Sequence, residues 1–470
     1  MSKYTLTLSL FVLLIGCKSI QLPTEKPMVS MPEKFTDTND TLSEVKILWS
    51  DFFVDIKLKL LIQEALSNNL DLQNAMQNIE IAKANYSRAK GLLMPSVNAG
   101  TSAGVTKYGD YTQEWAGNKT TEMLPGRIIP QNLTNYYIGF VSNWELDFYG
   151  KIKDQNKSAQ ARFLASSEAK SWVQTNLIAM LANTYYELIG LDNQMIILKQ
   201  NIALQEKSLN IVKILKEAGR GNELAINQFE AEILNAKYEL NQITQSIVEF
   251  ENIINTLLSR FPQPIDRIQN NLSESSLLKY RSGIPSMLLQ NRPDVKMAEQ
   301  ELIAARFDTK IAKKEFYPSV NINAGLGLNG FSPTLLFSLP SAAYNLLGGL
   351  TAPVFNRANI KANFATASAL QISALNNYQQ SIVVAFTEVY NEMKNFNNLD
   401  ESFQIKQQQV AKLEKAIEYA DLLFQSNRAN YLEVLVAQQN LLQAKLDLNE
   451  LSKLQRQSSI NLYKALGGGQ

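Results

Sequence analysis

The side chains that could do chemistry in this chain are almost all carboxylates. The sequence has no histidine and a single cysteine, Cys17. This composition excludes Ser-His and Cys-His nucleophile systems, zinc sites that contain histidine, and paired-cysteine motifs. A carboxylate hydrolase would need two acids that converge in a pocket, and the sequence shows no such pair. We therefore expect no enzyme, no metal site and no bound cofactor other than a covalent lipid.

Two groups of charged residues resemble active-site constellations. Arg292, Pro293 and Asp294 are consecutive, but Pro suits the first position of a helix and Asp suits its first turn. We interpret this triplet as a helix start. Glu145 and Asp147 fall on the polar side of an expected strand, where we expect them to face a lumen and to tune ion preference at most.

Cys17 ends a segment that is typical of a lipoprotein signal peptide. Lys3 precedes an apolar run from Leu6 to Ile15, which is too short to span a bilayer. The run ends in Leu-Ile-Gly-Cys, which resembles a bacterial lipobox. Cys17 could instead be a small buried hydrophobe. Its place at the end of the apolar core favours cleavage before it and acylation of its thiol. Lys18, where an inner-membrane lipoprotein commonly has Asp, points to the outer membrane.

A long internal repeat organises the rest of the chain. Residues 68–100 and 291–323 follow one plan at a constant offset of 223 residues, which superimposes Asp294 on Asp71 and Pro318 on Pro95. Such a duplication predicts two like halves. In each half the hydrophobic period is helical before the proline, and residues after it alternate with a period of two. The pattern predicts a mainly α protein with a small β part.

The alternating segments predict four strands. Two lie near 97–105 and 136–146, and two lie near 320–328 and 344–354. A soluble hairpin and a membrane barrel wall would both alternate in this way. Four strands cannot close a barrel, so membrane strands would require several chains to share one. The connection at 109–133 is longer than its counterpart at 331–341, as expected of exposed tips.

Two very long helices follow the strands. Residues 150–217 and 358–426 contain no proline, and at 1.5 Å per residue each would form a rod of roughly 100 Å. Short turns at 218–221 and 427–430 lead into returning helices at 223–260 and 431–466. We expect each pair to pack as an antiparallel coiled coil, because such a rod needs a partner.

An ordered series of motifs covers nearly all of Trp49 to Gly469. The motifs are LIQEALSNNLDL, MPSVNAG, NWELDFYGKI, IPSMLLQNRPDVKMAEQELIAA, FYPSVNI, TAPVFN, NYLEVLVAQQNLL and LYKALGGG. The series resembles the TolC-like outer-membrane efflux channels, in particular the lipoprotein branch related to OprM. The resemblance implies a homotrimer in which each chain gives four strands to a twelve-stranded outer-membrane barrel, continuous with a long periplasmic helical barrel.

The repeat and the resemblance together divide the chain into six segments. They are a signal peptide (1–16), a lipidated tether and equatorial segment (17–48), a first repeat (49–262) with a hairpin at about 96–147, an equatorial linker (263–284), a second repeat (285–466) with a hairpin at about 319–354, and a C-terminal end (467–470).

The resemblance implies a passive exit duct in the outer membrane of a Gram-negative bacterium. An inner-membrane pump and a periplasmic adaptor would deliver small molecules, meaning drugs, toxic compounds or metal ions. Nucleic acid is not an expected partner, because 45 basic and 44 acidic residues nearly balance. Alternatives are the channel of a type I protein secretion system and a trimeric coiled-coil structural lipoprotein. The latter would not need alternating strands.

The resemblance also implies which residues of the two helical turns have a function. Adaptor contacts would fall on Ala218, Gly219, Arg220, Asn427, Arg428 and Ala429. The two glycines of the first turn could instead serve only its backbone. Related channels place acidic residues and a Tyr-Arg pair at the periplasmic gate, and this chain departs from that pattern. Glu418 and Asp421 remain as gate candidates, although either could be part of a solvated helix face.

Overall fold

The computed structural model describes residues 21–25, 30–35, 48–268, 285–353, 355, 357–426 and 428–469. Contacts divide the chain into two units: the first holds residues 1–26, 81–163 and 300–375, and the second holds the rest. None of the helices in the described ranges is long and apolar enough to cross a membrane. The signal peptide, most of the 17–48 segment and residues 269–284 of the linker lie outside the described residues. The expected domain bounds stay a prediction.

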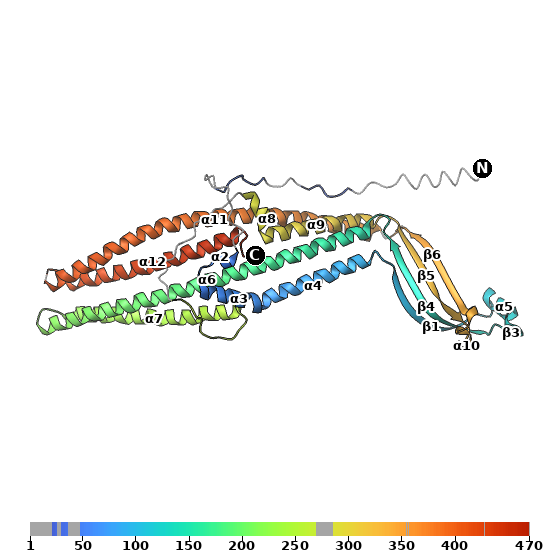
Figure 1. Ribbon diagram of the computed structural model, residues 1–470, viewed down its shortest axis with the longest axis horizontal. Helices are drawn as coiled ribbons and strands as arrows, with labels where there is room; N and C mark the ends of the chain where they lie inside the picture. The colour runs from blue at the N-terminus through green and yellow to red at the C-terminus, as the bar shows by residue number, and fades with distance from the viewer. Residues whose placement is uncertain are drawn as a thin grey trace. The chain divides into compact units, whose positions relative to one another are not determined.

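The first unit contains one antiparallel sheet of four strands (Figure 1). Its order is β1-β4-β5-β6, with bounds Ser96–Lys107, Asn132–Leu146, Ser319–Gly330 and Ala342–Thr351. β1 and β5 each begin at the residue after a repeat proline, because proline ends the helical hydrogen bonding. The four strands and the mainly helical fold predicted from the sequence are confirmed. Within the described chain, β1 and β6 each pair along one edge only.

The register sorts the sheet into an apolar and a polar face. Ala99, Phe140, Leu326 and Tyr344 are successive cross-strand partners, and the next row on that face also consists mainly of apolar residues. Alternate residues form the other face, which is rich in asparagine. There the Asn143 amide donates a hydrogen bond of 2.8 Å to the side-chain oxygen of Asn323. The sheet therefore has the two-sided character of a barrel wall.

Two glycines on the polar face allow a close backbone contact between β4 and β5. Gly139 and Gly327 are partners on the polar face. A Cβ atom at Gly139 would lie 2.5 Å from the Leu326 carbonyl oxygen and 2.6 Å from the Gly327 Cα. Side-chain space is therefore lost on the polar side at this pair, where the Tyr137 hydroxyl oxygen also lies 2.7 Å from the same point. Only glycine fits this approach.

The connections between strands carry short elements of their own. The longer one contains α5 (Gln113–Thr120), β2 (Glu122–Leu124) and β3 (Arg127–Ile128). The shorter one contains α10 (Pro333–Leu336) and the 3₁₀ turn η2 (Leu339–Ser341).

The helical segment expected before Pro95 is interrupted twice, which its periodicity did not predict. It is divided into α2 (Trp49–Phe52), α3 (Ile56–Asn68) and α4 (Leu70–Gly91). Asn69, at the second break, is extended and buried. Its side-chain amide donates to the Leu257 carbonyl at 2.9 Å, and its side-chain oxygen accepts from the Leu72 backbone at 2.9 Å. These bonds replace the helical bonds lost at the break.

The remaining helices follow the repeat closely. The long helices are α6 (Lys151–Glu217) and α11 (Arg357–Gln425), and the returning helices are α7 (Glu223–Leu257) and α12 (Tyr431–Ala465). Before α9 (Pro293–Lys314) the chain makes the short turns η1 (Pro285–Met287) and α8 (Leu288–Asn291).

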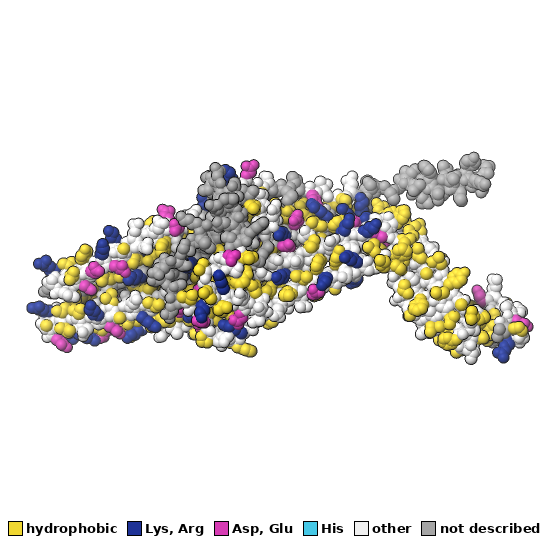
Figure 2. All heavy atoms as spheres, viewed as in Figure 1, with side chains coloured by type: hydrophobic (Ala, Val, Ile, Leu, Met, Phe, Trp, Pro, Cys, Tyr) yellow, Lys and Arg dark blue, Asp and Glu magenta, His cyan; other side chains and the backbone are white. Residues whose placement is uncertain are grey.

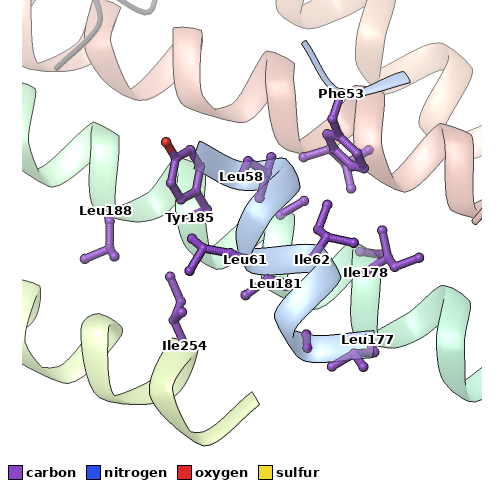
Figure 3. Packing of buried hydrophobic residues seen from close by; sticks show 14 of the residues in the cluster. Phe53, Leu58, Leu61, Ile62, Leu177, Ile178, Leu181, Tyr185, Leu188 and Ile254 are labelled. Carbon is purple, nitrogen blue, oxygen red and sulfur yellow. The ribbon is translucent and has the colours of Figure 1, made fainter. Parts of the chain in front are cut away.

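The main core of the second unit surrounds α3 (Figure 3). Leu58 and Ile62 of this helix are fully buried, together with Leu181 of α6 and Ile254 of α7. Tyr185 of α6 donates its hydroxyl proton to Asp55 at 2.7 Å. The same carboxylate caps the first turn of α3, so one acid joins the core tyrosine to the helix start.

Replacing Gly139 with alanine should destabilise the assembled protein. The added methyl group would meet backbone atoms of β5, which cannot give way without shifting the strand, and the expected cost is about 1–3 kcal/mol. Gly117→Ala is the control. Gly117 lies in α5 outside the sheet, and no described atom lies within 4 Å of the point that its Cβ atom would occupy. Heat-dependent electrophoretic migration would measure both variants, and equal stability would refute the close-contact explanation.

Candidate functional site

The first helical turn is built by its glycines. Gly219 has a φ of +71°, and the Arg220 backbone N–H donates to the Leu215 carbonyl at 2.8 Å, which closes the end of α6. A Cβ atom at Gly221 would lie 2.8 Å from the Lys216 nitrogen. Both glycines thus have a backbone role. Ala218 and Arg220 are exposed, so arginine is the charged group that this turn offers to a partner.

The second turn also exposes an arginine, although its sequence contains no glycine. Arg428 is exposed and its N–H donates to the Leu423 carbonyl at 2.8 Å, while Ala429 is half-buried. Asn430 caps α12 in a capping box with Glu433. Asn427 lies outside the described residues. Adaptor contact at either turn stays a prediction.

Each turn is held by an apolar helical hairpin. Leu198 and Ile202 of α6 pack against Ile233 and Ala236 of α7. In the other hairpin, Val410 and Ile417 of α11 pack against Leu441 and Ala444 of α12. The residues sit at helical spacings on facing sides, as the expected antiparallel pairing requires.

The two gate candidates differ in environment. Glu418 is exposed, whereas Asp421, three residues later on α11, is half-buried. Burial raises the pKa of the Asp421 carboxyl, and the charge of Lys207 opposes that rise. Tyr419 and Leu422 are each 63% exposed on the same part of the helix. Glu418 is therefore the more accessible carboxylate, in a surrounding that is partly apolar.

One expectation about the strand carboxylates is wrong. Asp147 lies beyond the end of β4, and its carboxylate accepts hydrogen bonds from the Ile152 and Lys153 backbones at 2.8 and 2.9 Å. It caps the start of α6 and does not line the sheet. Glu145 does lie on the polar face, where it pairs with Lys151 at 2.5 Å.

Arg292 has a structural role that the sequence only partly revealed. Its side chain is 1% exposed and donates to the carboxylates of Asp294 and Glu388, each at 2.6 Å, and to the Ala465 carbonyl at 3.1 Å. The helix start expected at this triplet is thus also a joint between α9, α11 and the end of α12. Because its charge is paired and hydrogen-bonded, its burial is tolerated.

Sequence reasoning missed two attachments of the N-terminal tether. In the first unit, Glu25 accepts hydrogen bonds from Arg306 and Gln371, both at 2.8 Å. These bonds, with that of Arg306 the larger cause, lower the pKa of the Glu25 carboxyl. In the second unit, Phe35 stacks on Phe386 with centroids 5.2 Å apart. Cys17, the expected lipidation site, lies outside the described residues and stays a prediction.

Charged and apolar side chains are distributed differently over the chain. On the face seen in Figure 2, the sheet carries mainly apolar side chains, and charged side chains gather on the helices and at the strand connections. This distribution agrees with the apolar sheet face that the register defines.

Comparison with known proteins connects these features to a family. A family profile described as "Outer membrane efflux protein" matches residues 61–259 and 284–468. The chain is 27% identical over 461 residues to the cation efflux system protein CusC of Escherichia coli O6:H1, covering 97% of this chain and 96% of that protein. It is 27% identical over 469 residues to the probable outer membrane lipoprotein SilC of Salmonella typhimurium, covering 99% and 98%. A crystal structure of CusC superimposes with a TM-score of 0.83 at 25% identity, covering 95% of this chain and 99% of that one.

Acidification should release the Glu25 attachment. The pKa of a carboxyl that accepts from Arg306 is lowered below its ordinary 4.5, so the pair is intact above that pH and is lost only as the pH falls through the lowered value. A spin label on Leu22→Cys should be immobile at neutral pH and mobile in strong acid. Arg306→Gln should move this transition to higher pH, whereas Lys310→Gln, one turn along α9, should not. A label equally mobile at both pH values would contradict the attachment.

Proposed function

Because the chain belongs to the outer membrane efflux protein family, we propose that it forms the outer-membrane duct of a tripartite efflux system in a Gram-negative bacterium. The family match confirms the resemblance seen in the motifs. The single observation that carries the proposal is the sheet, which has an apolar face, an amide-lined face and two edges with no partner in the described chain.

Closing those edges requires further copies. Unpaired backbone groups are not tolerated in lipid, so a four-stranded membrane sheet must pair β1 with β6 of another copy. Three copies give the twelve-stranded barrel of the TolC-like fold. The polar face then lines the lumen and the apolar face meets the lipid.

The helical hairpins serve the hand-over of cargo. We place the periplasmic adaptor at the two turns, where Arg220 and Arg428 are exposed. An inner-membrane pump supplies the driving force, and this chain makes and breaks no bond. We also place a lipid on Cys17, which the likeness to the lipoprotein SilC supports.

Small cations are the first class of cargo to test. CusC is described as part of a cation efflux system, and it matches almost the whole chain. The lumenal face carries neutral amides such as Asn98, Asn323 and Asn345, which contact a hydrated ion without retaining it. Such a lining also passes uncharged molecules, so drugs form the second class.

A deletion strain should become sensitive to one or more metal salts in a panel of mono- and divalent cations, measured beside dyes and detergents. The wild-type gene should restore resistance. A chain carrying Arg220→Glu and Arg428→Glu should not, because reversed charges would weaken adaptor binding by about tenfold or more, or about 1.4 kcal/mol. Lys412→Glu, an exposed position on α11 away from the turn, is the control. Full resistance in cells that carry the doubly substituted chain, with the amount of trimer unchanged, would refute the placement of the adaptor at the turns.

We further propose that Glu418 contributes more to the periplasmic gate than Asp421. In a trimer the exposed Glu418 supplies a ring of three carboxylates, whereas Asp421 is half-buried. Glu418→Ala should lower the preference for cations in planar bilayers, and Asp421→Ala should change it less. Wild-type conductance and selectivity in both variants would place the constriction elsewhere.

A further inference from the structure

A groove of about 730 Å³ lies on the apolar face of the sheet. Its lining includes Thr101, Ile138, Phe140, Leu326, Leu328 and Phe337. Five of these six side chains are fully apolar. The floor is low because Ala99 and Ala342, which also line it, carry only methyl groups.

The connection between β5 and β6 forms one wall of the groove. Gly330 belongs to the same face, since its partner Tyr136 alternates with the apolar residues of β4. A Cβ atom at Gly330 would lie 3.3 Å from both the Cα and the nitrogen of Leu336. The chain therefore folds back over the apolar face at this point. It leaves Phe337 73% exposed beside the groove.

A cation lies further along the same face. Lys107 alternates with Val105 and Thr101 on β1 and is exposed, and it forms no ion pair with any described residue. Lys107 lies six positions after Thr101, which corresponds to about 20 Å along the strand. With a strand tilt of about 45°, the difference in depth is about 14 Å, or roughly half of a hydrocarbon core. This is the spacing between a lipid head group and the inner part of its chain.

We propose that the groove binds one acyl chain of a phosphorylated glycolipid in the outer leaflet, with its phosphate held by Lys107. The inference rests on the proposed function, because it takes the apolar face as the membrane face. The apolar lining excludes water, and hydrocarbon is the solvent on this side of a barrel. A lysine that reaches from the edge of an apolar surface suits an anionic head group.

Native mass spectrometry of the purified trimer with added bisphosphorylated lipid A tests this site. The wild type should retain lipid A more strongly than phosphatidylethanolamine. Ala342→Trp, which fills the groove, and Phe337→Ser, which removes its wall without touching a strand, should each lower lipid A retention about tenfold. Val97→Trp, on the same face beyond the groove lining and on the side away from Lys107, should not. Lys107→Gln should reduce retention of lipid A and leave that of phosphatidylethanolamine unchanged.

Conductance of the same preparations in planar bilayers separates the two proposals. If the trimers conduct but both groove variants retain lipid A like the wild type, or if the two lipids bind equally, the groove is ordinary lipid contact and the inference is wrong. If wild-type trimers do not insert or conduct, the proposed function fails as well.

Discussion

Hydrogen bonding of the sheet edges is the constraint on which the rest of the structure depends. A strand in lipid has no water to satisfy its free N–H and C=O groups, and this sheet ends in two such edges, β1 and β6. One chain cannot meet the constraint alone. Its internal duplication already doubles the strands from two to four, and assembly of copies completes the closure. Closure places one face of the sheet against lipid and the other against the lumen. The strict separation of apolar and polar residues follows, because each face has a single environment.

Close packing between β4 and β5 depends on small residues on the polar side. Gly139 and Gly327 permit the neighbouring backbones to approach there, and the Tyr137 side chain occupies the space above both glycines. Larger side chains such as Phe140 and Leu326 occupy the opposite side. Alternation along each strand therefore gives the sheet an apolar exterior and a polar face on which the backbones can pack closely.

Features with a local cause could be predicted from the sequence. The change of period after Pro95 and Pro318 located the starts of β1 and β5, and the absence of proline predicted α6 and α11. Features that depend on distant partners could not. The break at Asn69 rests on a carbonyl 188 residues away, and the Glu25 attachment joins residues 281 apart. The role of Asp147 was predicted wrongly because β4 ends one residue earlier, at Leu146. The sequence pattern does not show whether the next residue continues the strand or caps the following helix. At the candidate site, the positions of the turns could be predicted from the sequence. The burial of Asp421 could not, because it depends on packing against other helices.

The asparagine pair on the polar face has a consequence for how the duct can change. Asn143 and Asn323 are neutral, and the Asn143 amide donates one hydrogen bond to Asn323 across the two strands. In a symmetric trimer each residue occurs three times around the axis, so one substitution changes three positions. A change of Asn143 to Asp would therefore add three negative charges to one level of the lumen and remove the donor of three hydrogen bonds. The charge of the lumen can therefore vary only in steps of three. On a neutral lining, even one substitution to a charged residue makes a large change in that charge.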